Sequence, residues 1–181
     1  FVAYAPENYQ DSFFEMVPEA YSCFEQVGED IGQRMLHAFS HVFDLGYSKV
    51  VLVGCDIPHI QCATYEAAYK MLEDFDIAIA PTYDGGCCLI GLKAPCQRIF
   101  VNDFQWGNQS VVEQTYNMAN QLGLSVSMLD KYRDIDEYED LVALWQTFND
   151  ERTVHENRPR HTLAYMHQYL YEGVAEWMHT V

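Results

Sequence analysis

Short apolar runs alternate with segments of helical periodicity along this chain. The run Val50–Val53 is β-branched and apolar on both faces, which is typical of a central strand in a parallel sheet covered on both sides. Similar short runs predict further strands at 1–5, 21–25, 76–80, 87–92 and 124–129. The alternation of strands with helical segments favours an α/β fold.

Apolar residues three or four positions apart predict the helices. Ile31, Met35 and Phe39 have this spacing, and Gly46 fits the left-handed residue that ends many helices. Further helices are predicted at 9–16, 64–74, 95–100 and 109–122, in a stretch that ends at 148, and at 161–178. We expect one domain over 1–148 and a C-terminal helical extension over 149–181 that packs on the domain or pairs two chains as a homodimer.

Charge narrows the choice of ligands. The net charge of −17, from 27 acidic and 10 basic residues, argues against nucleic-acid binding, because such a surface repels phosphate backbones. An anionic small substrate would need a divalent cation, backbone N–H groups or a few well-placed cations. No apolar run approaches the roughly 20 residues that cross a membrane. The six cysteines include no CxxC pair, and we expect reduced, mostly buried thiols in a cytoplasmic protein.

Asp56 is the first candidate for chemistry. Gly54 ends the strand Val50–Val53, Asp56 follows two residues later, and Pro58 closes the turn. In open α/β sheets ligands bind beyond the carboxyl ends of the strands, where an acid commonly binds a divalent metal or a substrate hydroxyl. The alternative is an Asx-turn or a helix cap.

A glycine-containing loop with Gly28, Asp30, Gly32 and Arg34 runs into the helix that begins near Ile31. It has the features of a backbone cradle for an anionic or nucleotide group at a helix N-terminus. The alternative is a simple turn in which Asp30 caps the helix.

Two further acidic segments follow strands. Asp84-Gly85-Gly86 separates two strand-like runs and predicts a hairpin turn, in which the glycines would let a ligand approach the backbone. Asp134 and Asp136 follow the last predicted strand and are candidates for a second acidic site facing Asp56. The alternative for this pair is N-capping of the next helix.

Five segments together resemble a bacterial family of nucleotide-diphospho-sugar-transferase-like glycosyltransferases, the DUF2064 type. They are Gln26–Met35, Gly54–Pro58, Asp84–Gly91, Trp106-Gly107 and Asp134–Leu141. The resemblance covers about residues 1–145. It implies a GT-A fold, which is a Rossmann-like three-layer α/β/α sandwich with a mostly parallel sheet.

The resemblance also implies roles for individual residues. It makes Asp56 and Asp136 ligands of Mg²⁺ or Mn²⁺, and Asp56 and Asp84 catalytic. The remaining implied roles are nucleotide binding by Gly28, Asp30, Gly32 and Arg34, and binding of the second substrate by Gly85, Gly86 and Trp106.

The sequence departs from the family pattern in three places. Cys87-Cys88 replaces an aromatic pair, and Glu137-Tyr138 replaces Thr-Pro. The chain also begins at Phe1 in what resembles the interior of a strand. We therefore expect that the first strand of the family and its glycine-rich, Lys/Arg-containing phosphate loop are missing from this sequence.

The resulting hypothesis is a metal-dependent transferase that uses a nucleotide-sugar donor and an unknown small-molecule acceptor. One alternative is nucleotidyl transfer of the guanylyltransferase type, which needs the same acid, metal and phosphate cradle. Another is a non-catalytic nucleotide-binding module on the same fold. A phosphate-ester hydrolase with Asp56 as nucleophile is a weaker reading, because no supporting lysine and threonine pattern surrounds that residue.

Overall fold

A four-stranded sheet forms the centre of the molecule in the computed structural model, which describes residues 1–5, 10–100, 111–149 and 158–169. Its strand order is β3 (Val50–Val53), β5 (Cys87–Leu92), β4 (Ile77–Pro81) and β6 (Val126–Met128). β4 pairs parallel with β6, whereas β5 runs antiparallel to both β3 and β4. Three of the four strands therefore share one direction, and the sheet is mostly but not purely parallel.

The position of β3 corrects one expectation. Within the described residues β3 is an edge strand that pairs antiparallel with β5, not a central strand of parallel neighbours. The cause is the β4–β5 hairpin, which inserts β5 between β3 and β4. The predicted turn at Asp84–Gly86 does join these two strands, and Gly85 has a φ of 97°, in the left-handed region that glycine adopts most easily.

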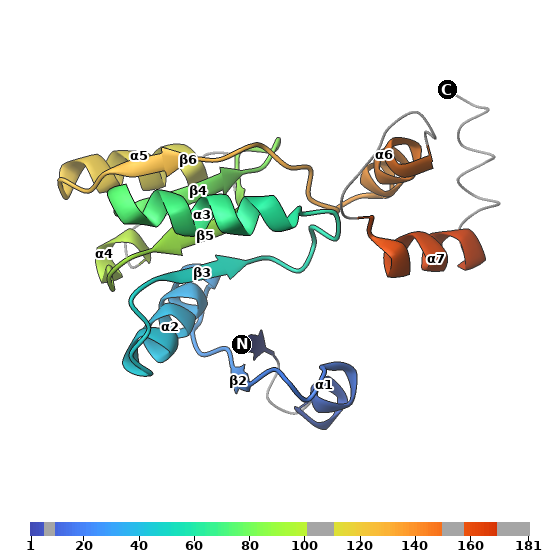
Figure 1. Cartoon of the computed structure of the whole chain (residues 1–181), viewed down its shortest axis with the longest axis horizontal. Coiled ribbons are helices and arrows are strands. Elements are labelled where there is room, and N and C mark those ends of the chain that lie inside the picture. Colours follow the sequence, from blue (N-terminus) through green and yellow to red (C-terminus); the bar gives the residue numbers. More distant parts are fainter. Residues whose placement is uncertain (6–9, 101–110, 150–157, 170–181) are drawn as a thin grey trace.

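Helices cover both faces of the sheet, as Figure 1 shows. Along β4, Ile77 and Ile79 face one core and Ala78 and Ala80 face the other, because successive side chains of a strand point in opposite directions. The isoleucine face packs against α2 (Ile31–Asp44), α4 (Gln97–Phe100) and α5 (Val111–Gln121), and the alanine face against α3 (Cys62–Asp74). The result is the predicted three-layer α/β/α arrangement.

A second, two-stranded sheet pairs β1 (Val2–Tyr4) in parallel with β2 (Cys23–Glu25), and α1 (Gln10–Met16) lies between them in the chain. Phe24 of β2 packs against the same core as α2. The N-terminal segment is thus attached to the sandwich through the helix that follows it.

The last two described helices, α6 (Tyr138–Asn149) and α7 (Arg160–Tyr169), form a separate hydrophobic cluster. Trp145 and Phe148 of α6 share it with Leu163 and Met166 of α7. In Figure 1 this helical pair lies beyond one end of the central sheet. Only the first part of the predicted helix 161–178 is described, and no helix in the described part of the chain is long and apolar enough to cross a membrane.

Candidate functional site

Three carboxylates converge at the ends of the strands that share one direction. Asp84 lies in the turn after β4, and Asp134 and Asp136 lie in the loop after β6. One oxygen of each carboxylate lies within 4.8 Å of the others. Asp84 and Asp136 are exposed and Asp134 is half-buried, so the cluster opens to solvent.

The turn itself holds Asp84. The Thr82 hydroxyl donates to Asp84 Oδ1 at 2.5 Å, and the backbone N–H of Gly86 donates to the same oxygen at 3.0 Å. A Cβ atom at position 86 would lie 3.0 Å from Thr82 Oγ1 and 3.3 Å from Asp84 Oδ1, so glycine leaves room for this network. The bonds occupy one carboxylate oxygen and leave the other for a ligand.

Asp140 organises the loop that carries Asp134 and Asp136. Its carboxylate accepts from the backbone N–H groups of Asp136 at 3.2 Å and Glu137 at 3.0 Å, and from Arg133 at 2.9 Å. Burial opposes ionisation of Asp140, but these hydrogen bonds outweigh it and hold its pKa below the ordinary value. Asp140 thus supplies the cap of α6 that was considered for the earlier acids.

Asp56 lies beside this cluster without belonging to it. Its backbone oxygen accepts from the N–H of Ile135 at 3.1 Å, and its side chain is exposed. Burial raises the pKa of Asp134, and the charges of Asp84, Asp136 and Asp56 raise it further. The structure therefore places Asp56 close enough to the three clustered acids for its charge to act on Asp134. Asp134 was noted in the sequence as a partner of Asp136, but only the fold reveals how close it lies to Asp84.

The three clustered carboxylates are suitable ligands for a hard divalent cation. Carboxylate oxygens are the ligands that Mg²⁺ and Mn²⁺ prefer, and a cation would relieve the repulsion among Asp84, Asp134 and Asp136. Of the two predicted ligands, Asp136 lies in this set of three, and Asp56 lies on the neighbouring loop.

The loop before α2 is built as a helix start. Asp30 Oδ1 accepts from the backbone N–H of Gln33 at 2.8 Å, and Arg34 Nε donates to the oxygen of Gly28 at 3.1 Å. Gly28 has a φ of 146°, and a Cβ there would lie 2.6 Å from Gln33 Cβ, so this turn requires glycine. Gly32 is buried in the first turn of the helix. The capping role considered for Asp30 is present, and nucleotide binding by this loop stays a prediction.

Trp106 lies in the segment 101–110, outside the described residues. Among the six cysteines only Cys88 is buried, and Cys55 and Cys62 are exposed, so the expectation of mostly buried thiols was wrong. Both exposed thiols lie between β3 and the first turn of α3, where the chain passes over the surface. Burial, with the charge of Asp84, raises the pKa of the Cys87 thiol to about 11.

Comparison with known proteins agrees with this fold. A solved structure of a putative nucleotide-diphospho-sugar transferase from Desulfovibrio desulfuricans G20 superposes with a TM-score of 0.80 at 30% identity, over 92% of this chain and 73% of that one. None of the curated proteins matches the chain. The model of a family described as uncharacterized protein conserved in bacteria matches residues 1–108. Together with the resemblance of motifs, these matches show that the chain belongs to the DUF2064 family.

Proposed function

We propose that this protein is a metal-dependent transferase that uses a nucleotide-diphospho-sugar as donor. The observation that carries the proposal is the convergence of Asp84, Asp134 and Asp136 at the carboxyl ends of the strands, within 4.8 Å of one another. The similarity to a structure named as a transferase of this class supports it.

The acids have different tasks in this proposal. Asp84, Asp134 and Asp136 hold Mg²⁺ or Mn²⁺, which neutralises charge on the donor diphosphate and on the leaving group. Asp56 is exposed beside them and contacts a substrate hydroxyl. In glycosyl transfer the acceptor oxygen forms a bond to the anomeric carbon while the bond from that carbon to the diphosphate oxygen breaks. The acceptor proton passes to a carboxylate or to water.

Calorimetric titration tests the proposal. We expect Mn²⁺ to bind the protein, and one nucleotide-diphospho-sugar from a panel to bind only in its presence and not in EDTA. Asp134→Asn is expected to weaken Mn²⁺ binding about tenfold or more, since it removes one charged ligand from the set. Asp130→Asn is the matched control, because Asp130 is exposed on the same loop and lies outside the cluster.

The outcomes separate the alternatives. Folded protein that binds no metal, or equal losses in the two variants, would contradict the metal site. Metal-dependent binding of a nucleoside triphosphate in place of a nucleotide-sugar would favour nucleotidyl transfer. Donor binding without turnover across an acceptor panel would favour the non-catalytic module.

A further inference from the structure

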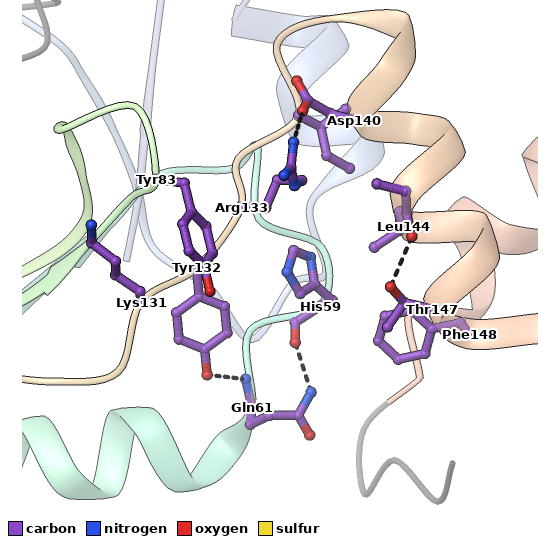
Figure 2. Close-up of a pocket in the computed structure, with 12 residues that line it drawn as sticks. His59, Gln61, Tyr83, Lys131, Tyr132, Arg133, Asp140, Leu144, Thr147 and Phe148 are labelled. Atoms are coloured by element: carbon purple, nitrogen blue, oxygen red, sulfur yellow. Dashed lines mark hydrogen bonds and ion pairs between the residues drawn. The ribbon is translucent and has the colours of Figure 1, made fainter. Parts of the chain in front are cut away.

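A pocket of about 430 Å³ lies between the loops that follow the strands and one face of α6. Figure 2 shows the residues that line one wall of the pocket. His59 lies in the loop after β3, Tyr83 in the turn after β4, and Tyr132 in the loop after β6. Leu144 and Phe148 of α6 form the opposite side. The volume is in the range of small-molecule sites.

Two cations line this pocket in a strongly acidic protein. Lys131 Nζ lies 5.5 Å and Arg133 Cζ 5.9 Å from the centre of the Tyr83 ring, so both belong to one wall. Arg133 is paired with Asp140 at 2.9 Å. Among the described residues, no carboxylate lies within ion-pair distance of Lys131. The pocket therefore presents one positive charge that has no carboxylate partner in the described part of the protein.

The rest of the lining suits a flat, apolar ring. The rings of His59 and Tyr132 are 5.6 Å apart, and those of His59 and Phe148 are 6.1 Å apart. The Tyr132 hydroxyl is bonded to the Thr64 hydroxyl and accepts from the backbone N–H of Gln61, which fixes the orientation of its ring. A ligand ring entering the pocket thus meets aromatic surfaces that are already ordered.

The pocket adjoins the carboxylate cluster through the chain itself. Tyr83 directly precedes Asp84, and Arg133 directly precedes Asp134. We propose that this pocket binds the acceptor, and that the acceptor is a small molecule carrying a ring and an anionic group, either a carboxylate or a phosphate. The acceptor role rests on the proposed transferase function, whereas the binding of a ring-bearing anion to this pocket does not depend on that function.

Titration of the whole protein in EDTA tests this inference apart from the transferase activity. Phenyl phosphate and benzoate are the anionic probes, and benzyl alcohol is the neutral one. We expect at least one anion to bind more tightly than benzyl alcohol. Lys131→Met is expected to weaken that binding about tenfold, because it removes one charge-assisted contact. Lys131→Arg keeps the positive charge and is expected to preserve the binding. Lys70→Met is the matched control, because Lys70 is exposed on α3 and does not line the pocket.

Several results would overturn the inference. They are equal binding of the anions and benzyl alcohol, equal losses in the Lys131 and Lys70 variants, and no anion binding by folded protein. Anion binding that is weakened in Lys131→Met but unchanged in Asp134→Asn would support the pocket even if no nucleotide-sugar bound. If a nucleotide-sugar binds in a metal-dependent way and displaces phenyl phosphate, the pocket belongs to the donor, and this result would contradict the acceptor role.

Discussion

The backbone N–H of Ile135 donates a hydrogen bond to the backbone oxygen of Asp56, with 3.1 Å between nitrogen and oxygen. This bond joins the loop after β3 to the loop after β6, although two strands of the sheet lie between them. It holds Asp56 next to Asp134 and Asp136, which flank Ile135 in the sequence. The acidic site therefore depends on backbone contacts between loops as well as on the side chains themselves.

Gly54→Ala is expected to displace the Asp56 carboxylate without unfolding the protein. A Cβ atom at this position would lie 2.5 Å from Asp56 Oδ1, and that exposed side chain is free to turn away. We expect affinity for the nucleotide-sugar to fall several-fold, with unchanged Mn²⁺ affinity in the absence of donor and an unchanged thermal unfolding midpoint. The double variant Gly54→Ala/Asp56→Ala should bind no more weakly than Asp56→Ala alone. Additive losses would show that Gly54 acts independently of Asp56.

Thr82→Val is expected to weaken metal binding through Asp84. Valine matches the shape of the buried Thr82 side chain but cannot donate the 2.5 Å hydrogen bond that orients the carboxylate. We expect Mn²⁺ affinity to fall several-fold, and the free energy of unfolding to fall by about 1 kcal/mol at most, because water can reach the exposed Asp84. Thr82→Ser keeps the hydroxyl and should retain Mn²⁺ affinity. If the two variants bind Mn²⁺ equally, the hydroxyl has no role in positioning Asp84.

Asp140→Asn is expected to loosen the loop before α6. The variant weakens the charged bonds to the N–H groups of Asp136 and Glu137 and removes the ion pair with Arg133. We expect a loss of roughly 1–2 kcal/mol in the free energy of unfolding and faster hydrogen exchange at these two amides. Glu139→Gln, an exposed charge change in the same turn, is the control. Unchanged exchange in Asp140→Asn would show that the loop does not need this cap.

Asp76→Asn is expected to destabilise the protein in a pH-dependent way. Hydrogen bonds from the backbone and side chain of Ser125, and then Lys93 at 3.2 Å, hold the pKa of Asp76 below its ordinary value. A lowered folded-state pKa contributes stability above the ordinary pKa of about 4 and loses it as the pH falls toward the folded-state value. We expect Asp76→Asn to cost roughly 1–2 kcal/mol at neutral pH.

The difference between the wild type and Asp76→Asn should shrink below about pH 4. Denaturant unfolding from pH 3 to pH 7 measures it. Asp74→Asn, which removes an exposed charge two residues away, is the control and should leave the curve unchanged. A difference that stayed constant across this pH range would show that the charge of Asp76 is not what joins β4 to Ser125.

Local sequence signals were enough to predict the elements, but not their order in the sheet. The apolar run at Val50–Val53 and the Asp-Gly-Gly turn after β4 each contain their own evidence, and both elements are present. The place of β3 at the edge depends on pairing with β5, more than thirty residues later in the chain. Periodicity within one segment contains no information about such a partner.

The candidate site, like the fold, could be predicted only in part from local sequence. Position after a strand was sufficient to select Asp56, Asp84 and Asp136 as candidates, because strand ends meet at one edge of a sheet. The neighbourhood of Asp84 and Asp134 needs the parallel pairing of β4 with β6. The pocket could not be predicted at all, since Lys131 and Phe148 lie on separate elements that meet only in the fold.

β5 lies between β3 and β4, antiparallel to both, and so separates the strand that leads to Asp56 from the strand that leads to Asp84. Neighbouring strands lie about 4.8 Å apart, so one strand between β3 and β4 sets these two roughly 10 Å apart. If β3 paired directly with β4, the Asp56 loop would lie one strand width closer to the acids after β4 and β6. The β4–β5 hairpin thus sets the distance between the loop that carries Asp56 and the loops that carry the three clustered acids. Asp84 lies at the tip of this hairpin. A longer or shorter hairpin would move Asp84, and with it the proposed metal site, relative to the Asp56 loop.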